Sequence, residues 1–575
     1  MKIILGINTY HADSSACIIV DGKLIAAIEE ERINRIKHFS GYPIESIREC
    51  LRIANKQDTE ITDIAFNTKP LSNLFAKGVF FLKNFSYDKN SFSERFKKKI
   101  NVKKLLFENF TLNTNIKFHY IEHHLAHIAS AFYPSGFKDA VGLSIDGSGD
   151  FVTLAISECK NNKITLTEKT NFPNSLGIFY HAMTQFLGFK NYGDEYKVMG
   201  LAAYGTPKYF NKIKANLFKD NNKLIFELNL DYFNHHKNNF QYITEDTLYI
   251  DEIFNSNLIK LFSPELENKT NKEQFIKDFA ASVQKVYEFF FKKIIEKLFL
   301  NNFSKNLVFA GGCALNSSAN KFITNEKKQF RNIYIPCAPG DNGGALGAAF
   351  VVSAKYSTKV ENFKNPYLGK EFSNHEVLEI LKHNNYKDKV TYKFMENDVD
   401  LFKSAAQLIS EGNVIGWFQG CMEFGPRALG NRSILADPRN PNMKSIINMK
   451  IKRRESFRPF APSVIEKYQS DWFESDFTNP YMSSLAIVKS DKQKKIPSVT
   501  HIDGTARLQT VNSNNNSKYL NLINAFYLLT GVPILLNTSF NENEPIVMKP
   551  EESLDCLIRT DMDAVFINNY LVTKV

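Results

Sequence analysis

The chain opens with the stretch KIILGINTYHADSSACIIVDGKLIAAIEEER (residues 2–32). Three runs rich in Ile, Val, Leu and Ala alternate with polar segments, and the dipeptide Asp21-Gly22 between the second and third runs is typical of a tight β-hairpin. A helix-like segment (44–55) and the apolar run ITDIAFNT (61–68) follow. The order of elements predicted from this part of the chain is β-β-β-α-β.

A second cycle of the same kind starts at VGLSIDGSGDFVTLAIS (141–157), with a strand, a glycine-rich turn and another strand. A long amphipathic helix is predicted over 272–302, because Phe and Val recur there at intervals of three and four residues. Two further strand segments follow, NLVFAGG (306–312) and NIYIP (332–336). The β-β-β-α-β order resembles the ribonuclease-H-like half of the actin, Hsp70 and sugar kinase superfamily, so we expect an α/β domain built by duplication of such a half.

The length of 575 residues exceeds that of one ordinary core, so more than one domain is expected. A polar stretch containing Pro and Gly at 355–374 is a natural linker. It separates a first domain (1–354) from a second α/β domain (375–575). The segments 72–115 and 208–271 show no pattern that assigns them a role.

The composition is that of a globular protein, with 43% hydrophobic and 23% charged residues. No apolar run reaches the roughly eighteen residues of a membrane span, and the N-terminus lacks the features of a signal peptide, so a cytoplasmic location is expected. The seven cysteines are scattered without a C-x-x-C pair, which favours reduced thiols. The net charge of +11 is compatible with nucleic acid, a membrane surface or a phosphate-bearing substrate.

Two histidines, His123 and His127, lie four residues apart in EHHLAH (122–127). On the first turn of a helix their side chains share one face and could bind one divalent ion, although His pairs at this spacing also occur on ordinary polar helix faces. Asp341 stands in the glycine-rich turn PGDNGGALGAAF (339–350) and could complete the ligand set. Imidazole combined with carboxylate suits iron, manganese or zinc rather than calcium.

Residues that follow predicted strands are further candidates, because ligands bind at the carboxyl ends of strands in open α/β sheets. His11 follows the first strand and is either a proton-transfer residue or a structural residue of the turn. Glycine-rich turns follow two other strands, in SIDGSGD (144–150) and AGGCALN (310–316), where backbone N–H groups could contact a phosphate. Plain hairpins and tight strand-to-helix connections contain the same glycines.

Longer motifs follow one another along nearly the whole chain. They include EHHLAHIASAFYPSGF (122–137), DEYKVMGLAAYG (194–205), GCMEFGPRALGNRSILADPRN (420–440), KIKRRESFRPFAPSV (450–464) and HIDGTARLQTV (501–511). The motifs and their order resemble the NodU/CmcH/TobZ-type O-carbamoyltransferase family. Tyr196 departs from the family pattern, which has a small residue there, and leaves the shape of the local pocket open.

The resemblance implies an N-terminal domain like the tRNA threonylcarbamoyl-transfer protein and a C-terminal YrdC-like domain. The C-terminal domain would make carbamoyl adenylate from carbamoyl phosphate and ATP and release pyrophosphate. The N-terminal domain would then carbamoylate a hydroxyl of a small molecule, such as a sugar, an antibiotic or another secondary metabolite. The implied cofactor is a divalent metal, ferrous iron; ATP and carbamoyl phosphate are the implied substrates, and Mg²⁺ is an optional companion of ATP.

The family match also implies roles for individual residues. The metal would be held by His123, His127, Asp146 and Asp341, and His11 would be the catalytic residue that deprotonates the acceptor hydroxyl. The nucleotide-binding residues would be Gly147, Ser148, Gly149, Glu195, Lys197, Gly311, Gly312 and Asn316. Carbamoyl phosphate and ATP, whose phosphates need a concentration of cations, would be bound in the C-terminal domain by Arg427, Arg432, Lys452, Arg454, Arg458, His501, Arg507, Asn537, Thr538 and Ser539.

Two other functions stay open at this point. A tRNA threonylcarbamoyl-type transferase would fit the positive charge, but that system divides its catalytic halves between separate chains, whereas here they are fused. A catalytically silent nucleotide-binding regulator would keep the fold without needing His11 or the metal ligands, which this chain has. The expected partner is a small-molecule hydroxyl acceptor of unspecified identity, with no nucleic acid and no membrane, and a homodimer is left open.

Overall fold

The computed structural model describes residues 1–84, 97, 101–221, 224–237, 241–244, 246–267, 272–300, 303–326, 330–356, 365–455 and 457–575. Parts of the segments 72–115 and 208–271, and most of the first half of the predicted linker 355–374, lie outside the described residues. The chain forms two compact units. The N-terminal unit comprises Met1–Glu31, Lys37–Ile323 and Lys327–Phe363, and the C-terminal unit comprises Arg32–Ile36, Thr324–Glu326 and Lys364–Val575.

The first sheet of the N-terminal unit contains the predicted opening strands. Its strand order is β3-β2-β1-β4-β5. The antiparallel strands are β1 (Ile3–Asn8), β2 (Ser15–Val20) and β3 (Lys23–Glu29), and β4 (Asp63–Phe66) and β5 (Lys117–Tyr120) extend the sheet in parallel from β1. Helix α2 (Ile44–Ile53) connects β3 to β4 and packs on β2 and β3. The predicted β-β-β-α-β order is therefore observed.

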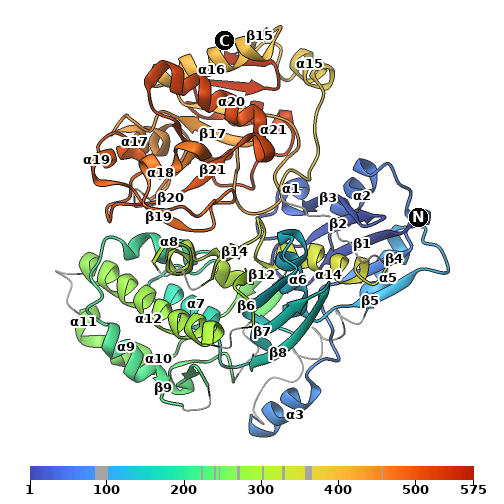
Figure 1. Ribbon diagram of the computed structural model, residues 1–575, viewed down its shortest axis with the longest axis vertical. Helices are drawn as coiled ribbons and strands as arrows, with labels where there is room; N and C mark the ends of the chain where they lie inside the picture. The colour runs from blue at the N-terminus through green and yellow to red at the C-terminus, as the bar shows by residue number, and fades with distance from the viewer. Residues whose placement is uncertain are drawn as a thin grey trace. The chain divides into compact units, whose positions relative to one another are not determined.

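The second sheet repeats this topology. Its order is β8-β7-β6-β13-β14, in which the first three strands pair antiparallel and the last two run parallel to β6. The strands are β6 (Asp139–Gly149), β7 (Val152–Lys160), β8 (Lys163–Asn171), β13 (Asn306–Ala310) and β14 (Asn332–Tyr334). The long helix α12 (Lys272–Leu300) precedes β13, as predicted. Two halves with one topology confirm the expected duplicated ribonuclease-H-like fold (Figure 1).

Two helices join the halves of the N-terminal unit. Helix α6 (His123–Ser135) packs on β6 and β13, whereas α14 (Gly344–Ser353) packs on β1, β2 and β4. The two helices also pack on each other, and they approach so closely that a Cβ at Gly347 would overlap the carbonyl oxygen of Ala126. The small residues of the GGALGAAF stretch are thus explained by this contact, which places the N-termini of both helices at one site.

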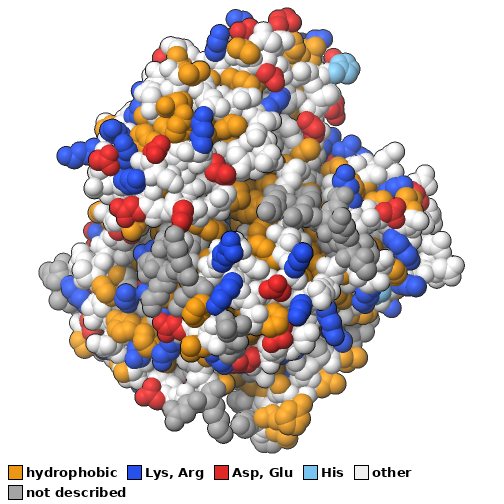
Figure 2. Space-filling model, in the orientation of Figure 1, with side chains coloured by type: hydrophobic (Ala, Val, Ile, Leu, Met, Phe, Trp, Pro, Cys, Tyr) orange, Lys and Arg blue, Asp and Glu red, His pale blue; other side chains and the backbone are white. Residues whose placement is uncertain are grey.

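The surface of the N-terminal unit includes an exposed apolar helix, α3 (Leu74–Lys83), within the segment 72–115. Leu74 and Phe75 are 59% and 88% exposed, and hydrophobic side chains gather at this end of the unit (Figure 2). Elsewhere on the face shown, Lys and Arg side chains are interspersed with Asp and Glu. No helix among the described residues is both long and apolar enough to cross a membrane.

The C-terminal unit is a separate α/β domain around a mixed sheet of eight strands. The strand order is β15-β24-β23-β16-β17-β22-β18-β21, with parallel pairing only for β16 with β23 and β18 with β21 among the described residues. The strands are β15 (Val390–Phe394), β16 (Ile415–Phe418), β17 (Arg432–Ala436), β18 (Ala461–Ile465), β21 (Gln509–Val511), β22 (Ile534–Ser539), β23 (Ala564–Ile567) and β24 (Tyr570–Lys574). Helices α16 (Asp398–Ser410) and α20 (Ser513–Thr530) pack together. Trp417 is buried in the core, where its ring lies beside Phe402 of α16.

Candidate functional site

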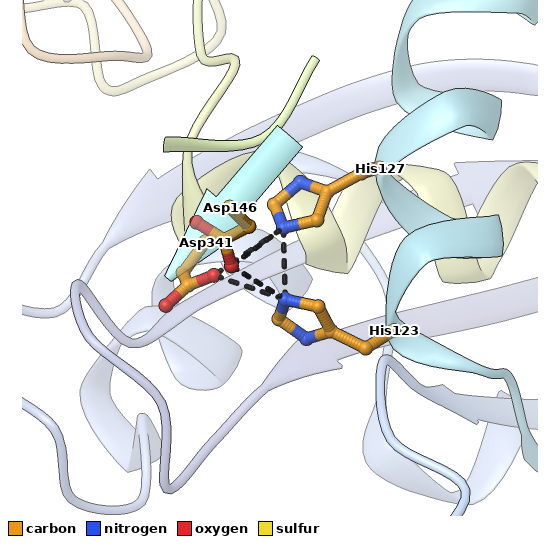
Figure 3. Close-up of side chains that lie close together, drawn as sticks. All are labelled: His123, His127, Asp146 and Asp341. Atoms are coloured by element: carbon orange, nitrogen blue, oxygen red, sulfur yellow. Dashed lines mark hydrogen bonds and ion pairs between the residues drawn. The ribbon is translucent and has the colours of Figure 1, made fainter. Parts of the chain in front are cut away.

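Four predicted ligands meet in the N-terminal unit: His123, His127, Asp146 and Asp341 (Figure 3). The histidines lie on the first turns of α6, Asp146 lies in β6, and Asp341 starts the short turn Asp341–Gly343 before α14. The two Nε2 atoms are 2.9 Å apart. His123 Nε2 lies 3.1 Å from Asp146 Oδ2 and 3.4 Å from Asp341 Oδ1, and His127 Nε2 lies 3.4 Å from the same Asp341 oxygen.

The electrostatics of this cluster are those of a cation site. Burial alone would raise the pKa of Asp146, but hydrogen bonds and positive charge from His123 and His127 hold it well below the usual value. Burial alone would lower the pKa of His127, but hydrogen bonds to the carboxylates of Asp146 and Asp341 raise it to about 9. Two imidazole nitrogens and two carboxylate oxygens that converge in a buried place form a donor set suited to iron, manganese or zinc. The residues therefore fit a divalent metal.

Two other carboxylates hold the start of α6 in place. Glu122 caps the helix by accepting the N–H of Leu125 at 2.8 Å. Asp150 Oδ2 accepts the N–H of His123 at 3.0 Å, and its Oδ1 accepts the hydroxyl of Thr68 at 2.9 Å. The bonds to Leu125 and His123 satisfy backbone N–H groups that a helix start leaves without partners. Asp150 was not among the predicted site residues, although it stands in the DGSGD motif, and it positions the His123 backbone.

Asp146 owes its orientation to an interruption of the sheet. The pairing of β6 with β7 shifts register between Ile145 and Gly149, so the intervening residues leave the ladder. Gly312 N–H donates to Asp146 Oδ1 at 3.0 Å, which turns Oδ2 toward the histidines. A Cβ at Gly149 would overlap the His123 ring, whereas one at Gly147 would meet no atom within 4 Å. The two glycines of DGSGD therefore have different roles. Gly149 leaves room for the His123 ring, whereas Gly147 borders open space.

The third histidine of EHHLAH has a structural role. His124 Nδ1 lies 2.9 Å from Ser144 Oγ, and its Nε2 lies 2.9 Å from the carbonyl oxygen of Val152. Burial first, and then the positive charge of His123, lower the pKa of His124 to about 3. Both ring nitrogens are thus used within the protein core, and His124 takes no part in the ligand cluster.

His11 stands directly beside the cluster. Its ring centre is 4.6 Å from that of His123, with the ring planes inclined by 30°. Asn8 shapes the turn that carries His11, because its Nδ2 donates to the carbonyls of Ala12 and Asp13 at 2.9 and 3.0 Å. The turn at the end of β1 therefore presents an imidazole to the candidate metal site.

The predicted nucleotide residues fall into two groups. Gly311, at φ +92°, and Gly312 adjoin Asp146 across neighbouring strands and lie close to the loop 146–149, which contains Gly147 and Ser148. The side chains of Glu195, Lys197 and Asn316 have internal partners instead: Glu195 pairs with His181 (2.6 Å), Lys197 with Asp194 (2.7 Å), and the Asn316 amide bonds reciprocally with Gln284 (3.1 Å for each bond). Asn316 also caps α13 (Ser317–Lys321), so its amide shapes the strand-to-helix turn.

The C-terminal unit gathers several predicted cations around Arg507. Burial first, and then the positive charges of Arg427 and Arg454, hold the pKa of Arg507 well below its ordinary value. Arg507 Nε is buried and makes no hydrogen bond to the described residues. Arg458 pairs with Glu455 at 2.7 Å. Mutual repulsion of these partly buried guanidinium groups is relieved by an anion, so this part of the unit fits a phosphate-bearing ligand.

Arg432, which the resemblance assigns to substrate binding, is held inside the C-terminal unit. The side chain is fully buried, and its two terminal nitrogens donate to the carbonyls of Gln419, Asn431, Lys370 and Gly420 at 2.8 to 3.1 Å. The guanidinium also stacks on Phe418, and burial lowers its pKa to about 10. These contacts stabilise the fold around Arg432. The sequence alone does not show which arginine of the motif is buried.

The other polar residues of the predicted set hold the edge of this site together. Lys452 Nζ donates to Ser539 O and Asn541 O, both at 2.7 Å. Asn537 Nδ2 donates to Ala428 O at 3.2 Å and lies 3.0 Å from Gln509 Oε1, while Thr538 pairs with Ile434 across β17 and β22. These contacts fasten β22 to the turn that carries Arg427.

Glu423, which was not among the predicted site residues, orders the turn that carries Arg427. Its Oε1 accepts the N–H groups of Leu429, Asn431 and Arg432 at 2.8, 2.7 and 3.1 Å. Gln509 Nε2 donates to the carbonyl oxygen of Leu429 at 2.9 Å. A buried carboxylate that gathers three backbone donors fixes the local backbone, so the position of Arg427 follows from Glu423.

Comparisons with known proteins agree with this arrangement. The family model described as "Carbamoyltransferase N-terminus" matches residues 3–350, and "Carbamoyltransferase C-terminus" matches residues 406–574. The chain belongs to the carbamoyltransferase family. As a member of this family it is an enzyme that transfers a carbamoyl group, which confirms the predicted family and enzyme class.

The chain is also similar to individual proteins over most of its length. The chain is 35% identical to nodulation protein NolNO of Sinorhizobium fredii, over 99% of this chain and 80% of that protein. It is 35% identical to nodulation protein NolO of Bradyrhizobium diazoefficiens over 79% of each chain, and 38% identical to an uncharacterized protein of Synechocystis over 100% of this chain and 97% of that protein. The match to a solved structure, HypF of T. kodakarensis, covers 62% of this chain and 48% of that chain at 14% identity, with a TM-score of 0.31.

Proposed function

We propose that this carbamoyltransferase is an ATP-dependent O-carbamoyltransferase that works through carbamoyl adenylate and acts on a hydroxyl of a small molecule. The observation that carries the proposal is the pairing of two unlike sites in one chain. The N-terminal unit has a buried set of two histidines and two aspartates beside His11. The C-terminal unit has partly buried arginines whose charges act on one another.

The C-terminal unit would form the adenylate. Carbamoyl phosphate and one water give carbamate and inorganic phosphate, and a carbamate oxygen then attacks the α-phosphorus of ATP as pyrophosphate leaves. Arg427, Arg454 and Arg507 would bind the phosphates and stabilise their negative charge. We thus propose that this unit is YrdC-like and uses ATP.

The N-terminal unit would carry out the transfer. His123, His127, Asp146 and Asp341 would hold a divalent metal, ferrous iron in this proposal, which when bound neutralises phosphate charge and orients the adenylate. Backbone N–H groups of the loop 146–149 would border the same phosphate. Their closeness to the cluster supports this placement.

His11 would act as the general base. A ring nitrogen of His11 would take the proton of the acceptor hydroxyl while the hydroxyl oxygen attacks the carbamoyl carbon. The bond from that carbon to the adenylate oxygen breaks, and AMP leaves with the electron pair. The product is an O-carbamoyl ester of the acceptor.

The test is incubation of the full chain with ATP and carbamoyl phosphate, with and without hydroxylated metabolites. Pyrophosphate release and a product heavier by about 43 daltons would support the proposal; the mass follows from replacement of a hydroxyl hydrogen by a carbamoyl group. A silent nucleotide-binding protein would release no pyrophosphate. A tRNA-modifying enzyme would require tRNA as acceptor and would bind it in a salt-dependent way.

A further inference from the structure

His501 lies just before β20 (Thr505–Arg507), the strand that ends with Arg507 of the arginine group in the C-terminal unit. Its turn is closed by two main-chain bonds, from His501 N–H to Thr505 O (2.7 Å) and from Gly504 N–H to His501 O (2.9 Å). Three side chains of this turn form a relay. The Thr505 hydroxyl donates to Asp503 Oδ1 at 2.7 Å, and Thr505 Oγ1 lies 3.0 Å from His501 Nδ1.

The relay determines which ring nitrogen of His501 carries the proton. A carboxylate can only accept, so the single hydrogen of the Thr505 hydroxyl is directed to Asp503. Thr505 Oγ1 can then only accept from His501, and Nδ1 must be the donor. In the neutral imidazole Nε2 is therefore an acceptor with a free lone pair.

The surroundings keep this imidazole neutral. Burial first, and then the positive charges of Arg507 and Lys444, outweigh the attraction of Asp503 and lower the pKa of His501 to about 4. His501 Nε2 is buried and has no hydrogen-bond partner among the described residues. A buried acceptor without a donor is costly, so a donor from a ligand is expected at this atom.

The ligand that fits combines an anion with an N–H donor. The positive charge of Arg507 lowers the pKa of His501, and the positive charges of Arg427 and Arg454 lower the pKa of Arg507 in turn. An anionic group is therefore expected beside the imidazole. Carbamoyl phosphate has both features, because its phosphate is joined to a carbonyl that bears an NH₂ group. Acetyl phosphate has nearly the same shape, with a methyl group in place of NH₂.

We propose that His501 selects carbamoyl phosphate over other acyl phosphates, because its Nε2 accepts a hydrogen bond from the carbamoyl NH₂ while the arginines bind the phosphate. The proposal rests on the proposed function of the C-terminal unit and names the residue behind its substrate choice. A methyl group at that place leaves the buried Nε2 without a donor. The loss is about 10- to 100-fold in affinity.

The experiment compares two stable analogues, carbamoylphosphonate and acetylphosphonate, which differ only in NH₂ against CH₃. Their affinities for the full chain are measured by calorimetry. We expect the wild-type protein to bind carbamoylphosphonate about 10- to 100-fold more tightly. In His501→Leu the two affinities should agree within about threefold, while that for acetylphosphonate stays within about threefold of wild type.

Two variants of the relay provide a matched pair. Thr505→Val removes the hydroxyl that holds His501 Nδ1, so the preference should fall, whereas Thr505→Ser keeps the hydroxyl and the wild-type ratio. The proposal is wrong if His501→Leu and Thr505→Val fold, as judged by melting temperature, and keep the wild-type preference. If His501→Leu does not fold, the Thr505 pair decides. A wild-type protein that binds neither phosphonate and releases no pyrophosphate would refute the proposed function together with this assignment.

Discussion

His123 Nε2 and His127 Nε2 lie 2.9 Å apart, and one oxygen of Asp341 lies 3.4 Å from each of them. Two imidazole nitrogens at this distance either share a proton in an N–H···N hydrogen bond or bind one metal ion together. Asp146 adds a second carboxylate to the same place.

Loss of one ligand should remove the metal without unfolding the protein. Asp341→Asn removes one carboxylate charge, and we expect at least about tenfold weaker binding of Fe²⁺ after anaerobic reconstitution. Metal content measured by mass spectrometry checks this. His124→Gln is the matched control on the same helix turn: it should lower the melting temperature, because His124 bonds Ser144 and Val152, and keep the metal. Equal metal content in both variants would contradict the assignment.

The two glycines of the DGSGD turn should differ in tolerance. Gly149→Ala should displace the His123 ring and reduce metal content, because its Cβ would overlap that ring. Gly147→Ala should retain the metal, since a Cβ there meets no atom within 4 Å. If both variants bind metal equally, the cluster does not depend on the position of His123 described above.

Two arginines of the C-terminal unit should give opposite results. Arg507→Ala should suppress pyrophosphate release and leave the melting temperature unchanged or raised, since it removes a partly buried cation repelled by Arg427 and Arg454. Arg432→Ala should lower the stability by about 2–5 kcal/mol, because four carbonyls lose their donor. Thermal unfolding and a pyrophosphate assay on both variants separate the roles; an unstable Arg507→Ala protein would argue for a structural Arg507.

Much of the N-terminal unit could be predicted from the sequence because its signals are local. The hairpin at Asp21-Gly22 and the four-residue spacing of His123 and His127 depend only on neighbouring residues. The spacing could not show that His124 belongs to the core, because that depends on its contacts with Ser144 and Val152.

The roles of buried polar residues were not predictable, because they depend on contacts that the fold creates. Arg432 and Arg507 both stand in motifs that the resemblance assigns to phosphate binding, and only the fold shows that carbonyls surround the first and cations the second. Asp150 and Glu423 were missed for the same reason. A carboxylate that accepts backbone N–H groups from a distant segment leaves no periodic signal in the sequence.

Acid should destabilise the N-terminal unit through a buried histidine away from the site. Burial lowers the pKa of His235 to about 3, while the unfolded chain binds a proton near pH 6.5. Below pH 6.5 the unfolded state therefore binds more protons, and stability falls by about 1.4 kcal/mol per pH unit until the folded pKa is reached. His235→Gln keeps a donor for the carbonyl of Pro173, so its melting temperature should fall less between pH 7 and pH 5 than that of wild type. An equal fall in both proteins would show that His235 titrates normally in the folded state.

The most direct test of the division between the two units is a comparison of His11→Asn with Arg507→Ala in the presence of ATP, carbamoyl phosphate and an acceptor. Carbamoyl adenylate is followed by mass spectrometry, and pyrophosphate by an enzymatic assay. We predict that His11→Asn forms adenylate and pyrophosphate but no carbamoylated product, whereas Arg507→Ala forms none of the three. Loss of adenylate and pyrophosphate in His11→Asn to the same extent as in Arg507→Ala would contradict the account.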